Sequence, residues 1–481
     1  MSKGRIVIKD GHVLSMDARV GELESGCVLI DDGRIVAVEP GLDGVDAEII
    51  DARGGVVMPG FVDTHRHTWQ TALRAICADW TLYDYTLGMR MTLSPRCTAQ
   101  DVYVGNYIGA LEALDAGVTT ILDFSHCNNT PAHADNAIKG LKEAGIRAVF
   151  AYGYFHPPMA EPYFTSHASR IEDSRRVHRE HLSASDGLLT MGVSLTEPGL
   201  IPFEQTRQEV EAAREMGVVM ATHTACVWGL PSGLDNFAAL ELLGPDMVHV
   251  HCNACTSHEW DLLRRSDAKV SCSPETEIQM GMGRPVIRRV LDLGLTLSLS
   301  CDVTSSNSGD MFTQMRLGLQ FARCMDNDAL NALGDNPTEL SYSVRDALAW
   351  ATINGAKAIG VDDRVGSLTP GKQADVIVVG PGNGRLNMIA PANPVGAVVS
   401  QANASNVQTV LVAGEAVKRD GKLIDVDFSR AKRMIEESCE GILARTLADG
   451  PILPEPRGSF SDFAVPMLPN FSLPPRAATE P

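Results

Sequence analysis

Short apolar runs separated by turn-forming residues open the chain. These runs occupy residues 5–8, 27–30, 34–38 and 48–51. Runs of this length, bounded by Gly and Asp, are typical of β-strands. The sequence Asp31-Asp32-Gly33-Arg34 joins two of them, and an Asp-Gly pair between apolar runs favours a two-residue hairpin turn. Residues 1–58 are therefore predicted to form a small β-domain, or part of one.

From residue 59 onward, short apolar runs alternate with stretches long enough for a helix. The candidate strands are residues 60–67, 119–124, 148–152, 190–195, 218–223, 247–251, 269–272 and 296–301. Repeated strand–helix units indicate a parallel sheet. About eight such units over roughly 300 residues match the size of a (β/α)8 barrel. We therefore predict an α/β fold with a barrel domain at residues 59–365.

The strand pattern returns after residue 365. Residues 375–379 and 407–412 are apolar runs, and Arg419-Asp420-Gly421-Lys422 is another turn. The simplest interpretation is one small β-sandwich domain built from both chain ends. It would consist of residues 1–58 and 366–426, with the barrel inserted between them.

The C-terminal region, residues 427–481, has two parts. Residues 428–448 have helical spacing, and residues 450–481 contain eight prolines. Because proline lacks a backbone N–H and clashes inside a helix, we expect neither a helix nor a central strand in this tail. Four of its apolar side chains are costly to leave in water: Phe460, Phe463, Leu468 and Phe471. We expect an extended segment that packs on its own barrel or on a neighbouring subunit of a homodimer or homotetramer.

Composition narrows the range of functions. The 481-residue chain carries a net charge of −19, so the basic face that nucleic acids require is not expected. No apolar run approaches the ~20 residues of a membrane span, and the first residues show no signal-peptide pattern. The eleven cysteines are odd in number and form no paired framework, which favours a reducing cytoplasm.

Titratable side chains gather where the predicted barrel strands end. Active sites of such barrels lie at the carboxyl ends of the strands. His65 and His67 end the first strand, and residues two apart on a strand face the same side. His223 ends the fifth strand, His251 the sixth, and Asp302 follows the eighth. Each alone could be a structural residue, but together they predict a metal site, because imidazole is a common ligand of zinc and iron.

Several motifs resemble those of the amidohydrolase superfamily. They are Pro59-Gly60-Phe61-Val62-Asp63-Thr64-His65-Arg66-His67, Asp115-Ala116-Gly117-Val118-Thr119-Thr120, His251-Cys252, Ser300-Cys301-Asp302, Ala351-Thr352-Ile353-Asn354-Gly355-Ala356 and Gly371-Lys372-Gln373-Ala374-Asp375. The resemblance covers nearly all of residues 1–425. Within the superfamily, the chain is most similar to the cytosine deaminase and chlorohydrolase branch, which includes guanine deaminase, S-adenosylhomocysteine deaminase and triazine hydrolases.

The resemblance implies one divalent metal ion per chain, zinc or alternatively iron. Its ligands would be His65, His67, His223 and Asp302. His251 would hydrogen-bond the activated water or a substrate heteroatom, and Asp302 would also take the proton of that water. No lysine lies near the end of the fourth strand, so a two-metal site built on a modified lysine is not expected. A second metal bridged by Glu197 stays an alternative.

One position departs from the deaminase pattern. That branch normally has a glutamate three residues after the fifth-strand histidine, where it carries a proton to the substrate ring, but position 226 is Cys226. Either Glu197 or Glu277 could replace this acid, Asp302 could carry out all proton transfer, or the chain could have lost hydrolysis. The two glutamates could also simply pair with an arginine such as Arg284.

Aromatic and amide side chains follow several predicted strands. They are Trp69, Gln70, Trp80, Tyr83, Tyr154 and Trp228, and the resemblance implies that Gln70 contacts the substrate. Only 5% of the chain is aromatic, so this clustering indicates a planar ring held by stacking. Ordinary loop packing is the alternative.

The predicted function is that of a cytoplasmic, metal-dependent hydrolase. It would act on a C–N bond of a small planar nitrogen heterocycle and release ammonia. Loss of chloride or an alkylamine, or hydrolysis of a cyclic amide, is the alternative that Cys226 favours. A non-catalytic scaffold on the same fold is less favoured, because such proteins lose metal ligands and this chain keeps all of them.

Overall fold

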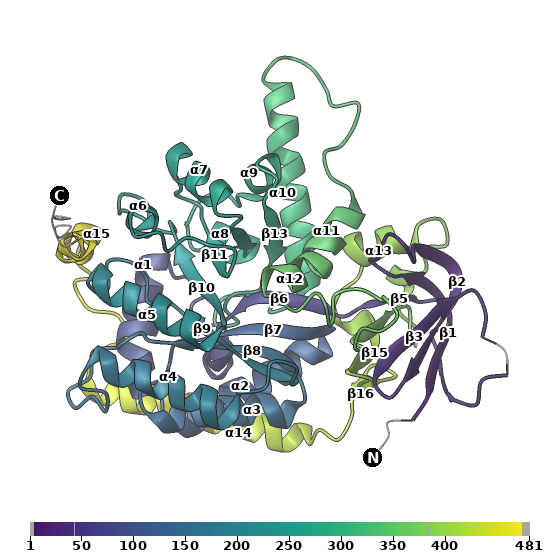
Figure 1. The fold of residues 1–481 in the computed structure, drawn as a ribbon, viewed down its shortest axis with the longest axis horizontal. Coiled ribbons are helices and arrows are strands. Elements are labelled where there is room, and N and C mark those ends of the chain that lie inside the picture. The colour runs from purple at the N-terminus through teal and green to yellow at the C-terminus, as the bar shows by residue number, and fades with distance from the viewer. Residues whose placement is uncertain (1–3, 43, 383, 474–481) are drawn as a thin grey trace, which may run out of the picture.

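The computed structural model describes residues 4–42, 44–382 and 384–473. It contains an eight-stranded barrel and a nine-stranded sheet that is built from the two ends of the chain (Figure 1). The barrel lies between the two parts of that sheet in the sequence, as predicted. No helix in these residues is long and apolar enough to cross a membrane. All eleven cysteines are free thiols.

The barrel contains every strand that the hydrophobic pattern predicts. The strands are β6 (Phe61–Arg66), β7 (Val118–Ser125), β8 (Arg147–Gly153), β9 (Leu189–Ser194), β10 (Val219–Thr224), β11 (Met247–His251), β12 (Lys269–Cys272) and β13 (Thr296–Leu299). Neighbouring strands pair in parallel and in sequence order. After β13, Asp302 bridges to Arg66. Its N–H donates to the His65 carbonyl at 3.0 Å, and its carbonyl accepts from His67 N–H at 2.9 Å. These bonds join the last strand to the first.

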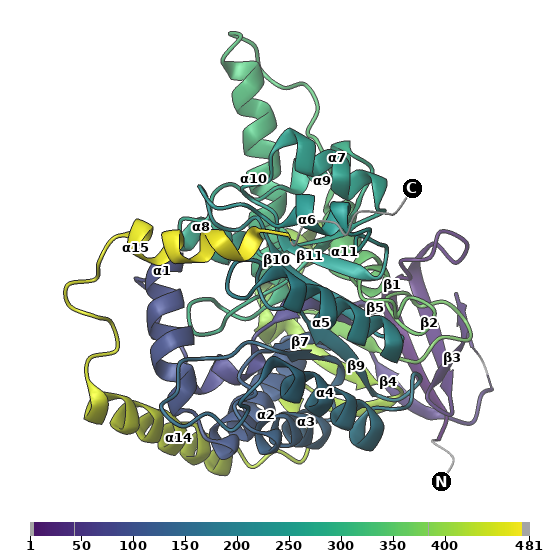
Figure 2. The same cartoon turned by 60° about the vertical axis from the view of Figure 1, so that its left-hand side comes forward.

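Helices cover the outside of the barrel. The helices between and after its strands are α1 (Leu82–Tyr85), α2 (Ala99–Asp115), α3 (Pro131–Ala144), α4 (His167–His181), α5 (Phe203–Met216), α6 (Leu234–Ala239), α7 (Ser257–Arg265), α8 (Pro274–Gln279), α9 (Ile287–Asp292), α10 (Met311–Asn331), α11 (Val344–Trp350) and α12 (Ile353–Ala358). Three shorter segments precede α2: η1 (Thr68–Leu73), the π-helical η2 (Thr86–Leu93) and η3 (Ser94–Arg96). The helix α10 extends away from the barrel as an arm (Figures 1 and 2).

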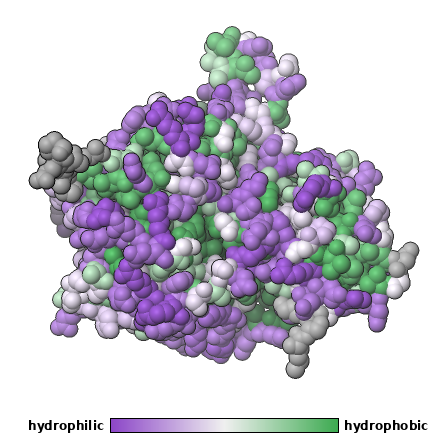
Figure 3. Space-filling model, viewed as in Figure 1, coloured by the Kyte–Doolittle hydropathy of each residue, from purple (hydrophilic) through white to green (hydrophobic). Residues whose placement is uncertain are grey.

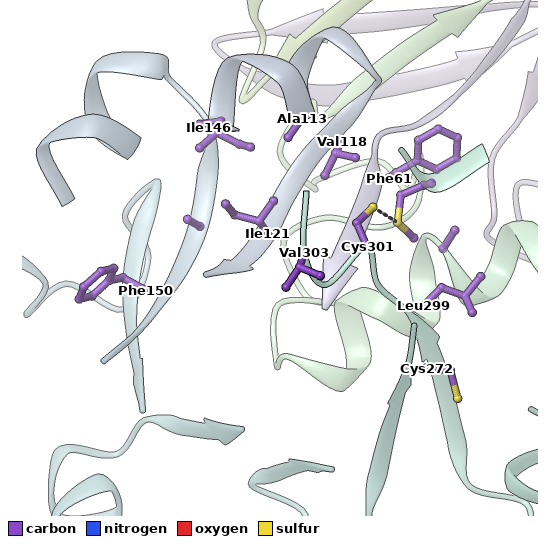
Figure 4. Packing of buried hydrophobic residues seen from close by; sticks show 14 of the residues in the cluster. Phe61, Ala113, Val118, Ile121, Ile146, Phe150, Cys272, Leu299, Cys301 and Val303 are labelled. Atoms are coloured by element: carbon purple, nitrogen blue, oxygen red, sulfur yellow. Dashed lines mark hydrogen bonds between the residues drawn. The ribbon is translucent and has the colours of Figure 1, made fainter. Parts of the chain in front are cut away.

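The barrel wall is closely packed with apolar side chains (Figure 4). Phe61 meets Phe312 of α10 edge to face, with ring centroids 5.0 Å apart. Cys301 Sγ lies 3.6 Å from Met311 Sδ. Gly105 of α2 allows the helix to contact the backbone of Trp69, because an added Cβ would collide with that carbonyl. This contact fixes η1, which follows His67 directly.

The chain ends form one continuous sheet rather than two separate ones. Its strands are β1 (Ile6–Leu14), β2 (Glu22–Asp31), β3 (Arg34–Glu39), β4 (Glu48–Asp51), β5 (Val56–Pro59), β14 (Val376–Val379), β15 (Val407–Val412), β16 (Glu415–Arg419) and β17 (Lys422–Leu423). The order is β17-β16-β15-β14-β5-β1-β2-β3, and β4 also pairs with β1. Irregular pairing at Gly11 interrupts β1, and Ala374 N–H donates to the Gly33 carbonyl at 2.9 Å. The turn between β2 and β3 therefore contacts the segment before β14, so the sheet curls and encloses a core between its own two halves. In this way a single curled sheet forms the two layers of the predicted sandwich.

Both predicted hairpin turns are confirmed. Asp32 and Gly33 connect β2 to β3 with φ of 47° and 77°. Asp420 and Gly421 connect β16 to β17 with φ of 47° and 76°. Two consecutive residues with positive φ make the turn that matches strand twist, and Asp-Gly adopts it at low cost.

The C-terminal tail corrects one prediction. Residues Phe428–Asp449 form the helix α14, as the spacing predicts, and this helix packs along α2. Beyond it, however, the tail forms the short helix α15 (Phe460–Ala464) and the 3-10 helix η6 (Val465–Phe471). Ser459 caps α15 through its bond with the Asp462 N–H, and Pro466 lies in the first turn of η6, where no N–H is needed. Prolines Pro474, Pro475 and Pro481 lie outside the described residues.

Three further helical segments complete the second part of the chain. These are the 3-10 segments η4 (Leu386–Met388) and η5 (Ala404–Asn406), with α13 (Pro394–Ser400) between them. One buried ion pair ties this part to the barrel. Arg147 of β8 binds Asp375 through Nε–Oδ2 and Nη2–Oδ1 contacts of 2.9 and 2.8 Å, and both side chains are 2% exposed.

Candidate metal centre and active site

Four donor atoms converge at the carboxyl end of the barrel. Asp302 Oδ1 lies 3.2 Å from His65 Nε2 and 3.5 Å from His67 Nε2. His223 Nε2 lies 3.2 Å from His65 Nε2. His251 Nε2 is 3.7 Å from the other oxygen, Asp302 Oδ2. The structure therefore brings together all five strand-end residues that the sequence singled out.

Hydrogen bonds orient two of these imidazoles. His67 Nδ1 donates to the Phe124 carbonyl at 3.0 Å. His223 Nδ1 donates to Glu197 Oε1 at 2.6 Å. With Nδ1 carrying the proton in each ring, the lone pair of Nε2 points to the common centre. Outer hydrogen bonds of this kind are what hold histidine ligands at metal sites.

The protonation states also suit a metal ion. Burial lowers the pKa of His65 to about 4, and it lowers the pKa of His67 and of His223. Burial alone would raise the pKa of Asp302, but the hydrogen bond from His65 and the neighbouring imidazoles outweigh it and lower this pKa. Neutral imidazoles and an ionised carboxylate are the forms that bind a metal. The buried set of three nitrogens and one oxygen fits a divalent cation such as zinc or iron.

His251 stands beside this centre with a partner of its own. Its Nδ1 donates to Glu277 Oε1 at 3.2 Å, and the same oxygen accepts the Ser273 N–H at 2.8 Å. Burial acts to lower the pKa of His251, but the hydrogen bond to Glu277 and the charge of Asp302 outweigh it, so this pKa is raised. Glu277 is completely buried and reaches the cavity only through His251.

Glu197 has a different neighbourhood. Besides His223, its carboxylate binds Arg90, with Nη2–Oε2 at 3.0 Å and a second contact between Nη1 and Oε1. Burial would raise the pKa of Glu197, but Arg90 and His223 outweigh it and lower this pKa. The glutamate therefore has an arginine partner, and that partner is Arg90 of η2 rather than Arg284.

A cavity of about 100 Å³ opens above the donor atoms. Its floor includes the metal-site residues His67, His223 and Asp302, together with His251. Its walls are largely apolar and include Leu82, Leu200, Val227, Leu230, Met280, Met282, Phe463 and Met467. Its polar and sulfur groups include those of Glu197, Arg90, Tyr85 and Cys226. Burial raises the pKa of Cys226 to about 12, so this thiol is a poor acid.

None of the six side chains predicted to bind the substrate is among the described residues that line this cavity. Trp69 is buried in η1 against His126, and Tyr154 donates to or accepts from Ser174 Oγ at 3.0 Å. Trp80 packs on Gly88. Trp228 is 60% exposed, with its indole N–H on the Met282 carbonyl at 2.7 Å. The helical turns after β6 rotate the first aromatics into the core, which the sequence pattern does not reveal.

The remaining two of the six support other groups. Gln70 is buried, and its amide donates to Tyr85 Oη at 2.7 Å and accepts from Ser305 Oγ at 2.8 Å. Tyr85, two positions after Tyr83, is the aromatic residue of this loop that reaches the cavity. Tyr83 donates to the Arg457 carbonyl at 3.0 Å and so holds the C-terminal tail.

Sequence reasoning missed Arg90 and Met467, whereas it expected Phe463 to pack on the barrel or on a neighbouring subunit. The signal for Arg90 was a single charge within the apolar run of residues 87–93. Its surroundings are buried: the guanidinium lies 4.0 Å from the centroid of the Phe155 ring, and its Nε has no partner among the described residues. Met467 carried no such signal.

Known proteins resemble this chain over most of its length. The family model described as amidohydrolase family matches residues 56–417. A 5'-deoxyadenosine deaminase of Methanosarcina mazei is 27% identical over 459 residues, which cover 92% of this chain and 99% of the relative. A 5-methylthioadenosine/S-adenosylhomocysteine deaminase of Symbiobacterium thermophilum is 29% identical over 434 residues, 86% of this chain and 94% of the relative.

Solved structures share the fold. A zinc-bound adenosine deaminase of Xanthomonas campestris superposes with a TM-score of 0.78 at 22% identity, over 91% of this chain and 98% of that one. A mutant atrazine chlorohydrolase of Arthrobacter aurescens, with zinc and atraton, gives 0.75 at 20% identity, over 90% and 100%. The chain belongs to the amidohydrolase family. It is a metal-dependent hydrolase that acts on carbon–nitrogen bonds.

Proposed function

We propose that the protein is an aminohydrolase that removes an amino group, as ammonia, from a purine-type heterocycle. The observation that carries this proposal is the convergence of His65, His67, His223 and Asp302 beneath a largely apolar cavity, with His251 beside them. The relatives are named as deaminases of 5'-deoxyadenosine and of 5-methylthioadenosine and S-adenosylhomocysteine, which supports the substrate class.

The four converging residues would hold one divalent metal ion, zinc before iron. When bound, such a metal lowers the pKa of a water molecule towards neutrality and so provides a nucleophile. Asp302 offers one oxygen to the centre and turns the other towards His251, so Oδ2 is placed to accept the proton of the attacking water. This assignment keeps both roles that the sequence resemblance gave to Asp302.

The proton that the ring or the leaving amino group requires would come from His251. Glu197 is unsuited to this step, because Arg90 and His223 keep it ionised. Glu277 is also unsuited to direct contact, because it is buried behind His251. The pair formed by Glu277 and His251 presents Nε2 of His251 towards the cavity as a hydrogen-bond donor. Glu277 is then a positioning residue, and Glu197 holds His223.

The direct test is a screen for released ammonia with zinc-loaded protein. The probes are 5'-deoxyadenosine, 5'-methylthioadenosine and S-adenosylhomocysteine, with guanine, cytosine, a pterin and an aminotriazine as the wider set. We expect turnover with at least one adenosine compound. Absence of ammonia from every probe, with metal bound, would contradict the proposal.

A second candidate activity is loss of a different leaving group. Cys226 occupies the position of the usual deaminase glutamate, and the pKa of its thiol is raised by burial, so it cannot replace that acid. Chloride, as an anion, departs without needing a proton, and an alkylamine needs one only on the leaving nitrogen. Chlorotriazines and alkylaminotriazines in the same screen, with chloride and amine as readouts, separate this candidate from deamination.

Two further expectations concern the cellular location and the oligomeric state. The free thiols of all eleven cysteines are compatible with the predicted cytoplasmic location. The predicted homodimer or homotetramer has a candidate contact at the tip of the α10 arm, where Leu330, Leu333 and Leu340 are exposed (Figure 3). Light scattering of the purified protein measures the oligomeric mass, and a monomer would contradict this expectation.

A further inference from the structure

The C-terminal tail reaches the active site. After α14 the chain runs along one side of the barrel and then crosses its mouth as α15 and η6 (Figure 2). Phe463 of α15 and Met467 of η6 line the same cavity as His67, His223 and Asp302. Two side chains near the C-terminal end of the chain thus line the same cavity as the candidate metal ligands.

Near its start, the crossing segment is fixed to the loop that follows β6. The Tyr83 hydroxyl lies 3.0 Å from the Arg457 carbonyl and 3.3 Å from the Ser459 carbonyl. Arg457 also forms an ion pair with Asp84, with Nη1–Oδ1 at 3.1 Å. The Tyr83 ring also packs with Phe460 and Phe463, with centroids 6.1 and 6.0 Å away, and the two phenylalanine rings contact each other at 6.3 Å.

At its far end, the segment is fixed to the opposite side of the mouth. Asn470 Nδ2 donates to the Gly199 carbonyl at 2.7 Å, and Asn236 Nδ2 donates to the Phe471 carbonyl at 2.6 Å. Gly199 has a φ of 95°, and an added Cβ would lie 2.6 Å from the Phe471 ring. Gly199 follows Glu197 in the loop after β9, so this anchor lies two residues from the partner of His223.

The cavity beneath the segment is small. About 100 Å³ remains inside when the segment is in place. Sites for small molecules usually enclose ~300–1,000 Å³. The apolar side chains of the segment therefore limit the space left for the part of a substrate that lies away from the metal-site residues.

We propose that residues 457–473 form the outer wall of the substrate cavity, with Phe463 and Met467 in contact with the part of the substrate that lies away from the reacting carbon. These two residues then determine the size of the accepted substituent. This inference rests on the proposed function for the identity of the substrate, but the covering of the site by the segment does not depend on it.

Substrate preference tests the specificity role. The double variant Phe463→Ala/Met467→Ala widens the outer wall. We expect the ratio of kcat/KM for S-adenosylhomocysteine to that for 5'-deoxyadenosine to rise about tenfold or more, since a change of one or more methylenes in an apolar pocket shifts discrimination by this order. Val465→Ala/Leu468→Ala, at positions 60% and 44% exposed in the same segment, is the matched control and should leave the ratio unchanged. An unchanged ratio in the first variant would overturn the specificity role.

Release of zinc to a chromogenic chelator tests the covering without any substrate. The zinc-loaded Phe463→Ala/Met467→Ala protein should lose its metal several-fold faster than the wild type and the control variant. Equal rates would overturn the covering of the mouth, even if deamination is observed. Faster release with no turnover of any probe would instead retain the covering and reject the proposed function. Met467→Ala alone serves both measurements if circular dichroism shows that the double variant is unfolded.

Discussion

At the scale of single residues, the candidate metal centre depends on which ring nitrogen of each histidine makes an outer hydrogen bond and which one faces the centre. His67 and His223 each use Nδ1 for an outer hydrogen bond and turn Nε2 inwards. Asp302 meets two of the three imidazoles with the same oxygen. Removing any one of these groups would leave three of the four proposed metal ligands.

The first prediction concerns the metal ligands. His67→Ala should lose both the bound metal and activity, because only three ligands would remain. Elemental analysis of protein that was not loaded with excess metal measures the content, and the wild type should hold close to one ion per chain. Two ions per chain would instead favour a bridging role for Glu197.

The second prediction separates the two glutamates. Glu277→Gln should lower kcat by about 10²–10⁴-fold, the usual contribution of a positioned acid or base, while metal content and KM change little. Glu197→Gln should weaken metal binding by about 10–100-fold, as loss of an outer partner of a histidine ligand does. The two isosteric variants act as controls for each other. Near-normal turnover and metal affinity in both variants would contradict the positioning roles of the two glutamates.

At the scale of elements, close contacts behind the site hold its loops. In α5, Glu209 is fully buried, and its carboxyl accepts from Thr196 N–H and Thr196 Oγ1, both at 2.8 Å. Thr196 precedes Glu197, so α5 fixes the residue next to the partner of His223. In α2, Gly105 performs a similar function for η1.

The third prediction concerns pH and Glu209. Burial raises the pKa of Glu209 to about 8, from 4.5 in the unfolded chain. Between these values the folded protein holds a proton that the unfolded chain has released, so this group makes stability fall as pH rises, by at most about 1.4 kcal/mol per pH unit. Glu209→Gln, which is neutral throughout, should flatten the dependence between pH 6 and 8. Denaturant unfolding at several pH values measures it, and equal slopes in both proteins would contradict the assignment.

The fourth prediction concerns Gly105. Gly105→Ala places a methyl group against the Trp69 carbonyl, so α2 and η1 must separate. We expect a loss of about 1–3 kcal/mol in the free energy of unfolding, as overpacking usually costs, and lower activity because η1 begins next to His67. Gly41→Ala, where an added Cβ meets nothing within 4 Å, is the control. Full stability of Gly105→Ala would show that the helix adjusts freely.

At the scale of the whole molecule, the curled sheet and the barrel are joined by a buried charge pair. Arg147 comes from a barrel strand and Asp375 from the segment before β14, 228 positions later. Asp375 also accepts the Ala413 N–H at 2.8 Å. Its carboxylate therefore connects a barrel strand to the segments before β14 and after β15.

The fifth prediction tests that junction. Arg147→Ala leaves the Asp375 carboxylate buried without its cation, and breaking a buried pair in this way costs ~3–5 kcal/mol. Thermal or denaturant unfolding measures the loss. Arg19→Ala, which removes an 82% exposed arginine from its pair with Asp17, should have a much smaller effect. Comparable losses in the two variants would show that the junction does not stabilise the fold.

The sequence by itself determined the barrel, its strands and the donor set. Strand alternation and parallel pairing follow from local periodicity, and each barrel strand lies within a few residues of its predicted bounds. Because parallel strands present their carboxyl ends at one rim, residues at those ends must meet there. For this reason, five residues from four strands could be placed at one site from the sequence alone.

Only the tertiary structure decided the partners and the walls of the site. Arg90 and Glu197 are 107 positions apart, and Phe463 is about 400 positions from His67, on a tail whose prolines suggested no helix. These contacts depend on the paths of loops, which have no periodicity, and on the space left after the core is packed. The pairing of Glu277 with His251, the support of Tyr85 by Gln70 and the closing of the cavity by the tail therefore became visible only in three dimensions.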